Sequence, residues 1–220
     1  MAKKQNVISR RRFVQSGVAG SVALSTLGFS RTARAQSSNP NILFIMADDF
    51  GFADASSYGQ RDYTTPNIDR LALEGMRFTQ AYSNSASCSP TRTALITGRY
   101  QYRLVVGLEE PIGPNTPKNV GLPPEHPTLP SILKKAGYAT ELIGKWHLGF
   151  LPDFSPLKSG YDKFFGFWGG TAHYFDHGPK SRTPLYEQEV PIEKNGYMTN
   201  LLGDRAVQKR GFRKSGQLPV

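Results

Sequence analysis

The chain alternates segments patterned as buried strands with segments patterned as helices, and this alternation limits the folds open to it. Residues 41–47 read NILFIMA, a continuous apolar run of strand length, as expected for a strand buried on both faces. Residues 65–75 carry a threonine cap, a proline in the first turn and a glycine stop, which predict a helix. Residues 76–83 are predicted to be extended, 128–136 helical and 138–143 a strand. We therefore predict an α/β fold with a largely parallel, mixed central sheet flanked by helices.

Residues 1–35 have the features of an export signal. They contain seven basic residues and no acidic one. The sequence SRRRFV at 9–14 leads into a mildly apolar run, 17–24, that is too short and too rich in glycine to anchor as a transmembrane helix. Ala-Arg-Ala at 33–35 is a small-x-small cleavage pattern. The segment resembles a twin-arginine signal, which implies the twin-arginine translocase as a partner, no stable membrane anchor, and a periplasmic or secreted location.

The net charge of +10 comes from the two ends of the chain. Seven basic residues lie in the export signal and five more lie in the last sixteen positions, whereas residues 36–204 carry 15 basic and 17 acidic residues. A basic nucleic-acid-binding surface would need its charge on the folded domain. We therefore expect no nucleic-acid partner.

A proline-rich stretch interrupts the alternation of strands and helices. Six prolines lie in residues 98–127. A connection of this length without regular structure is usually functional. We predict that it is a loop bordering a site, within a mature region of about 185 residues that is long enough for one domain core.

Asp48 and Asp49 directly follow the predicted strand at 41–47. Ligands of open α/β sheets bind beyond the carboxyl ends of the strands, so both side chains are expected at such a site. Adjacent carboxylates repel each other unless a proton or a cation neutralises them, and calcium and magnesium both take oxygen ligands. A divalent cation site and a solvated acidic turn both fit this pattern.

Cys88 is the only cysteine, so the chain has no internal disulfide. Pro90 suits the first turn of a helix that ends at Gly98, which would place Cys88 at a helix N-terminus, where amide donors favour an anion. Arg92 lies four residues on, faces the same way, and could bind an oxyanion or a charged form of residue 88. These flanking residues favour chemistry at Cys88 over a buried structural thiol.

Two longer motifs carry a resemblance to a known family. Residues 86–98 read ASCSPTRTALITG and resemble the first signature of the type I sulfatases. Residues 137–147 read GYATELIGKWH and resemble the second. Together with Asp48 and Asp49, the motifs occur in the family's order over residues 40–207. The resemblance implies the alkaline-phosphatase-like fold.

The resemblance also implies a nucleophile and a metal. Cys88 would be oxidised by a separate formylglycine-generating enzyme, and the hydrate of formylglycine would attack sulfur. A geminal diol can then expel sulfate by collapsing to the aldehyde, whereas a serine ester would need a second attack by water. Asp48 and Asp49 would bind calcium together with residue 88, and magnesium is the less favoured ion.

Three further residues receive roles from the two signatures. Arg92 would hold the hydrate, Lys145 would bind the sulfate oxygens, and His147 would hydrogen-bond the second hydroxyl and help to eject sulfate. The expected activity is hydrolysis of a sulfate ester of a carbohydrate or an aryl alcohol. A phosphonate or phosphodiester hydrolase of the same superfamily can share the Cys-x-Pro-x-Arg site and is the alternative enzyme.

The chain is short for this family, which is typically two to three times longer. The expected second acidic pair, a further lysine and a histidine would come from downstream, and calcium takes about six to eight oxygens. Asp176 and His177 resemble the missing pair in letters, but no long buried strand precedes them, so we expect a loop near the pocket instead.

The end of the chain supports this reading. Residues 197–207 begin an amphipathic helix, and the tail at 208–220 loses its periodicity. We interpret residues 36–220 as the N-terminal part of a sulfatase catalytic domain, apparently truncated by a frameshift or premature stop. A truncated, non-enzymatic sulfatase fragment is therefore a third hypothesis.

Overall fold

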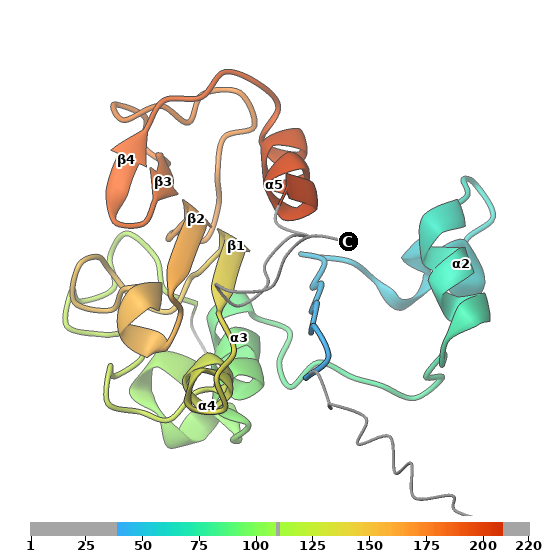
Figure 1. Ribbon diagram of the computed structural model, residues 1–220, viewed down its shortest axis with the longest axis horizontal. Coiled ribbons are helices and arrows are strands. Elements are labelled where there is room, and N and C mark those ends of the chain that lie inside the picture. Colours follow the sequence, from blue (N-terminus) through green and yellow to red (C-terminus); the bar gives the residue numbers. More distant parts are fainter. Residues whose placement is uncertain (1–38, 109–110, 209–220) are drawn as a thin grey trace, which may run out of the picture. The chain divides into compact units, whose positions relative to one another are not determined.

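The computed structural model describes residues 39–108 and 111–208, which divide into two compact units, one up to Arg77 and one from Phe78 onward. The predicted export signal at 1–35 and nearly all of the predicted tail lie outside the described residues. Within those two described ranges, no helix is both long enough and apolar enough to cross a bilayer. Figure 1 shows the elements of each unit.

In residues 39–77, the described part of the first unit, there are two short 3₁₀ turns and one helix: η1 (Phe52–Asp54), η2 (Ser56–Tyr58) and α2 (Pro66–Glu74). Helix α2 begins at its proline and ends before Gly75, as predicted. Thr65 does not cap the helix with its side chain; its Oγ1 accepts a hydrogen bond from the backbone N–H of Ser56 at 3.0 Å. Asp69 accepts from the Ser56 hydroxyl at 2.7 Å, and this bond is the main cause that holds the pKa of Asp69 below its usual value.

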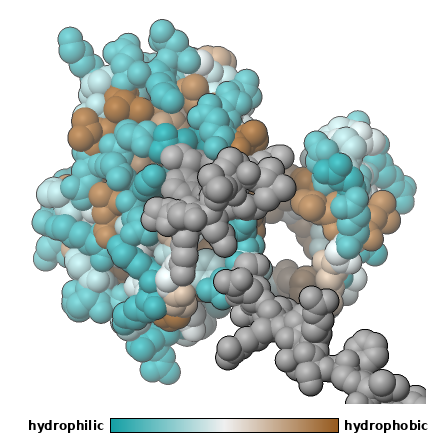
Figure 2. All heavy atoms as spheres, in the orientation of Figure 1, coloured by the Kyte–Doolittle hydropathy of each residue, from teal (hydrophilic) through white to brown (hydrophobic). Residues whose placement is uncertain are grey.

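Two of the predicted extended segments form no strand. Residues 41–47 have exposed apolar side chains, with Leu43 80% exposed, and residues 76–83 are irregular and exposed as well. The prediction of a buried strand at 41–47 is therefore wrong in this structure. A strand needs neighbours for its backbone hydrogen bonds. Among the described residues the four strands β1 to β4 pair with one another, and none of them pairs with residues 41–47. Figure 2 shows hydrophobic side chains exposed on the unit that contains α2.

The second unit is built on a four-stranded sheet with the order β1-β2-β3-β4 (Figure 1). Its strands are β1 (Glu141–Lys145), β2 (Lys163–Phe167), β3 (Leu185–Glu187) and β4 (Val190–Ile192). β1 and β2 are parallel, with Lys145 opposite Phe167, whereas β3 pairs antiparallel with both β2 and β4. The mixed α/β architecture is confirmed, and among the described strands one of the three pairings is parallel.

Three helices and three 3₁₀ turns accompany the sheet: α3 (Cys88–Thr97), η3 (Gln101–Arg103), η4 (Val105–Gly107), α4 (Leu129–Lys135), η5 (Pro156–Ser159) and α5 (Met198–Gln208). The three helices confirm the predictions made for these segments, and in the described residues of the proline-rich stretch the regular elements are η3 and η4. β1 begins three residues later than predicted. Gly137, with φ of 86°, and Tyr138 end α4 instead, because the Tyr138 N–H donates to the Leu133 carbonyl at 3.0 Å.

Two hydrophobic clusters hold the second unit together. The larger one joins α3, the proline-rich loop and the segment after β1, and consists of Ile96, Val106, Ile112, Leu122, Trp146, Leu148 and Phe150. The smaller one places α5 against the sheet through Phe165, Leu185 and Met198. The segment that follows β1 is therefore part of the core rather than a surface loop.

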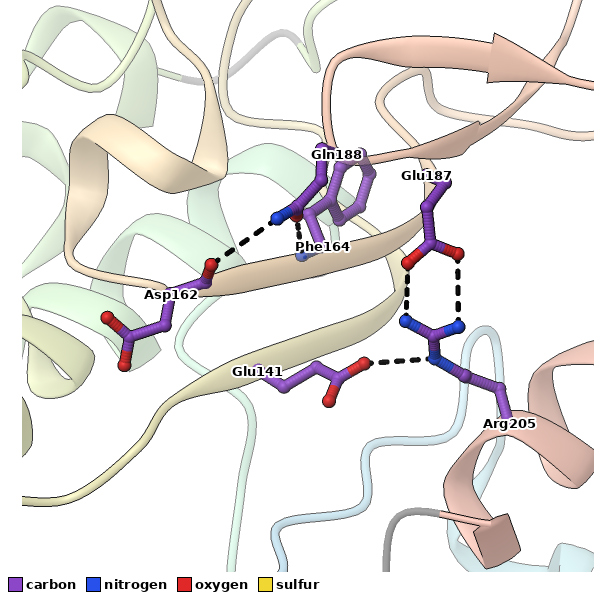
Figure 3. Close-up of polar contacts among 6 residues, drawn as sticks. All are labelled: Glu141, Asp162, Phe164, Glu187, Gln188 and Arg205. Carbon is purple, nitrogen blue, oxygen red and sulfur yellow. Dashed lines mark hydrogen bonds and ion pairs between the residues drawn. The ribbon is translucent and has the colours of Figure 1, made fainter. Parts of the chain in front are cut away.

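Arg205 of α5 connects three elements through ion pairs (Figure 3). Its Nε donates to Glu141 at the start of β1 at 3.1 Å, and its two terminal nitrogens donate to Glu187 of β3 at 3.0 and 2.5 Å. The guanidinium also lies 4.9 Å from the ring centre of Phe165. Burial opposes its charge, but the bonds to both carboxylates outweigh that effect and raise the pKa of Arg205.

Candidate active site

The first signature forms the N-terminal half of α3. Cys88 is the first residue of this helix and is half-buried. Arg92 lies one turn further on, so both side chains are on the same face of the helix. Ser89 and Thr93 are completely buried, and the Thr93 hydroxyl donates to the Ser89 carbonyl at 2.8 Å. The face of α3 that carries Ser89 and Thr93 therefore packs into the unit. Cys88 and Arg92 lie on the adjoining, half-buried face of the helix.

Arg92 connects α3 to the end of β1. Its Nη1 donates to the backbone carbonyl of Lys145 at 2.9 Å. Lys145 is the last residue of β1 and is only 8% exposed. Tyr161 is half-buried: desolvation raises its pKa to about 12, and the charge of Arg92 acts in the opposite direction. Arg92 of the first signature is thus anchored on the backbone of Lys145, the residue of the second signature that ends β1.

His147 is held in a defined orientation two residues after β1. It is 4% exposed, and its φ of 58° lies in the left-handed region, which is uncommon for a residue other than glycine. Its backbone N–H donates to the Trp168 carbonyl at 2.9 Å, and its Nε2 lies 2.5 Å from the Ile112 carbonyl oxygen. Because a carbonyl can only accept, Nε2 carries the proton. In a neutral ring, Nδ1 is then the proton acceptor.

Ile112 joins the two signatures through its backbone. Its carbonyl accepts from His147, and its N–H donates to the Ser89 hydroxyl at 3.0 Å. The proline-rich loop is therefore held between α3 and the segment after β1. The prediction that this loop borders a site agrees with its contacts to both signatures.

Gly170 lies against the imidazole of His147. A Cβ atom built at this glycine would lie 2.7 Å from Cε1 and 2.8 Å from Nε2 of the ring. Such contacts do not occur between unbonded atoms, so only glycine allows this approach. The pair Gly169-Gly170 after β2 is a sequence signal for a close backbone contact that our sequence analysis did not use, and it also missed Ile112, Ser89 and Tyr161.

Asp48 and Asp49 belong to the first unit, whereas the other four predicted residues belong to the second. Both carboxylates are exposed, and Asp49 has a φ of 51°. They follow an irregular segment, which corrects the prediction that they end a formed strand. Two adjacent carboxylates still offer the hard oxygen ligands that calcium prefers.

Asp176 and His177 do not act as a pair. Asp176 is exposed, whereas His177 is 1% exposed and its Nε2 lies 2.7 Å from the Lys194 carbonyl oxygen. The imidazole of His177 is therefore part of the folded loop rather than a ligand set with Asp176. This agrees with the prediction of a loop in this segment.

The fold and these contacts define a class of α/β protein in which an arginine on a cysteine-bearing helix bonds to the carboxyl end of a sheet strand. The sulfatase family profile matches residues 40–210. The chain belongs to the sulfatase family, whose members are hydrolases.

Relatives and solved structures agree with this assignment. The chain is 41% identical to N-acetylgalactosamine-6-sulfatase of Sus scrofa over 82% of its length and 40% identical to arylsulfatase A of Bos taurus over 78%. It covers 37% and 33% of those proteins, so it spans about a third of each. The crystal structure of Ps i-CgsB superimposes with a TM-score of 0.65 at 33% identity, covering 76% of this chain and 41% of that one.

Proposed function

We propose that this protein hydrolyses sulfate esters of a carbohydrate or an aryl alcohol, with residue 88 as the nucleophile after its oxidation to formylglycine. The observation that carries the proposal is the convergence of the two signatures. Arg92 of α3 bonds to the carbonyl of Lys145, and Ser89 is connected to His147 through Ile112. The two relatives named above are an N-acetylgalactosamine-6-sulfatase and an arylsulfatase, so their names support both substrate classes.

Arg92, Lys145 and His147 have separate tasks in this proposal. Arg92 and Lys145 meet the negative charge that develops on the transferred sulfuryl group, and their fixed positions avoid a reorganisation cost during the reaction. His147 hydrogen-bonds a hydroxyl of residue 88 through Nδ1 and assists the departure of sulfate, because its Nε2 is committed to Ile112. The core around this segment excludes water and strengthens these interactions.

Asp48, Asp49 and residue 88 would hold a calcium ion. Neighbouring carboxylates repel each other unless a cation neutralises them, so the donor set fits a hard divalent ion, calcium in preference to magnesium. When bound, calcium would supply Lewis acidity toward the sulfuryl oxygens. A formylglycine-generating enzyme and the twin-arginine translocase are the proposed maturation partners, with export to the periplasm or the exterior.

The proposal is tested on protein purified from its native host. The peptide that contains residue 88 should show a loss of about 18 Da from cysteine, which is the mass change for formylglycine. The same protein should hydrolyse 4-nitrophenyl sulfate faster than bis(4-nitrophenyl) phosphate or an aryl phosphonate, with Cys88→Ala as the blank. Faster turnover of the phosphate diester would favour the alternative enzyme. An unmodified cysteine without turnover would favour a non-enzymatic sulfatase fragment.

Replacing Gly170 with alanine is expected to lower kcat for 4-nitrophenyl sulfate about 10- to 100-fold, because the new methyl group displaces the His147 ring. The ring must leave its position at Ile112 to avoid the methyl group. The displacement should appear as a shift of the His147 imidazole resonances in NMR spectra, independently of turnover.

Gly169→Ala is the matched control for Gly170→Ala. A Cβ atom at Gly169 would meet only the Thr171 carbonyl oxygen, at 3.8 Å, which is an ordinary contact. This variant should keep both the His147 resonances and the turnover of the parent protein. Equal kinetics for the two glycine variants would contradict the role given to Gly170.

A further inference from the structure

Ser89 is a buried hydroxyl beside the candidate nucleophile, and it bonds to a distant segment of the chain. It directly follows Cys88 at the start of α3 and is completely buried. Its Oγ accepts a hydrogen bond from the N–H of Ile112 at 3.0 Å, across 23 residues of sequence. A buried backbone N–H needs an acceptor, and Ser89 supplies it for Ile112.

Ile112 is held at both of its backbone polar groups. Its N–H donates to Ser89, and its carbonyl accepts from Nε2 of His147 at 2.5 Å. Its side chain is 8% exposed and packs in the larger hydrophobic cluster with Trp146 and Leu148. Packing determines where this side chain lies, whereas the hydrogen bonds determine how the peptide groups on either side of it are rotated. The direction of the carbonyl therefore depends on what the backbone is bonded to.

Thr116 orients the same carbonyl from its other side. The Ile112 carbonyl and the Gly113 N–H belong to one planar peptide group, so the direction of one sets the direction of the other. The Gly113 N–H donates to the Thr116 hydroxyl at 2.9 Å. The Thr116 N–H donates back to the Gly113 carbonyl at 3.1 Å, which closes a turn with Pro114 as its second residue. The acceptor for His147 is thus fixed by a closed turn.

The orientation of the His147 ring depends on this carbonyl. The backbone of His147 is fixed separately, because its N–H donates to the Trp168 carbonyl at 2.9 Å. The terminal torsion of a histidine has only broad minima, so a hydrogen bond decides it more than a rotamer does. The backbone of Gly170 lies against Cε1 and Nε2 and blocks movement of the ring toward it. A displaced Ile112 carbonyl would therefore rotate the ring rather than move the residue.

We propose that Ser89 and Thr116 are positioning residues, which through the backbone of Ile112 keep the proton of His147 on Nε2 and leave Nδ1 as the acceptor that faces residue 88. This inference rests on the proposed function, which gives His147 its task. Neither hydroxyl contacts the sulfate ester in this role. A neutral ring with its proton on Nδ1 instead could not accept a hydrogen bond there from a hydroxyl of residue 88.

The first test observes the His147 ring without turnover. In the full chain carrying Cys88→Ala, NMR of the imidazole nitrogens at a pH where the ring is neutral should show the proton on Nε2. Ser89→Ala and Thr116→Val should each raise the rate at which this proton exchanges with water about 10-fold, the effect of losing one buried hydrogen bond. An unchanged rate in both variants, or a proton on Nδ1 in the parent protein, would overturn the inference.

Two variants of Thr116 separate the hydroxyl from the shape of the side chain. Thr116→Val keeps the branched shape and loses the hydroxyl, whereas Thr116→Ser keeps the hydroxyl and loses the methyl group. Thr116→Ser should therefore keep the exchange rate of the parent protein. Thr116 is half-buried and lies outside both signatures, so this pair decides the question if Ser89→Ala does not fold. Equal exchange rates in the two Thr116 variants would overturn the inference.

Thr93→Val is the matched control for Ser89→Ala. Thr93 is also completely buried on α3, but its hydroxyl donates within the helix, to the Ser89 carbonyl at 2.8 Å. The control therefore removes a buried hydroxyl that takes no part in the bonds at Ile112. It should keep the exchange rate of the parent protein whatever its thermal midpoint. An equal rise in Thr93→Val and Ser89→Ala would show general loosening of α3 and would overturn the role of Ser89.

The second test measures turnover of 4-nitrophenyl sulfate per mole of formylglycine, since replacing Ser89 beside Cys88 can also change the extent of maturation. Thr116→Val should lower kcat about 10-fold and change KM by less than about twofold, because the ring acts in the transition state. A raised KM with an unchanged kcat would overturn the positioning role. If the parent protein shows no turnover while the exchange rates respond as expected, the proposed function is rejected and the coupling of Ser89 and Thr116 to His147 is retained.

Discussion

Replacing Arg92 with methionine is expected to lower kcat for 4-nitrophenyl sulfate by about 10²- to 10³-fold, the usual cost of removing one preorganised group that stabilises transition-state charge. Methionine keeps much of the length of the side chain but loses the charge and every donor. The bond from Nη1 to the Lys145 carbonyl is lost as well, so the two signatures are no longer joined at this point. The loss is measured by steady-state kinetics on matured protein.

Arg99→Met is the control for Arg92→Met. Arg99 follows the same helix, is exposed, and lies outside the candidate active site. It should keep the turnover of the parent protein. If Arg92→Met lowered the thermal midpoint so far that the protein unfolded at the assay temperature, the loss of kcat would reflect a role in the fold rather than in the reaction. A kcat equal to that of the parent protein would remove Arg92 from the proposed site.

Replacing Arg205 with methionine is expected to lower the free energy of unfolding by about 3 kcal/mol, because it leaves buried negative charge without its partner. Glu141 is the more critical carboxylate, since its side chain is only 11% exposed, against 38% for Glu187. The contact of the Arg205 guanidinium with the Phe165 ring would also be lost. For a domain of this size the change corresponds to a fall of roughly 10 °C in thermal midpoint.

Two further variants test the reason for the loss at Arg205. Adding Glu141→Gln to Arg205→Met should recover part of the stability, because the uncompensated charge is removed. Arg70→Met serves as the control, since Arg70 and Glu74 form an ion pair at 4.0 Å with both side chains more than 65% exposed. An exposed pair of this kind contributes about 0.5 kcal/mol or less. If Arg70→Met and Arg205→Met lowered the free energy of unfolding equally, burial of the carboxylates would not be the reason for the loss at Arg205.

The helices could be predicted because their signals are local. Pro66 and Gly75 bound α2, and the helix predicted through Pro90 to Gly98 is α3. The strands were predicted less well. The run at 41–47 has the composition of a buried strand but no partner among the described strands, and the short hairpin of β3 and β4 was not predicted.

The candidate active site divides in the same way. Cys88, Arg92, Lys145 and His147 were predicted from two motifs, because each motif keeps its residue types within one short segment. The residues that hold them in place were not found. Ile112 lies 35 residues from His147 and bonds through its backbone, which leaves no trace in its side-chain identity.

The sequence alone determined the family and the ends of the helices, because caps, prolines and glycines act within a few residues of where they stand. The tertiary structure decided which strands pair, where β1 begins, and how the His147 ring is oriented. Those features depend on hydrogen bonds and contacts between segments far apart in the chain, such as Ser89 with Ile112 and Gly170 with His147. Their free energy comes from burial and packing that no short segment contains.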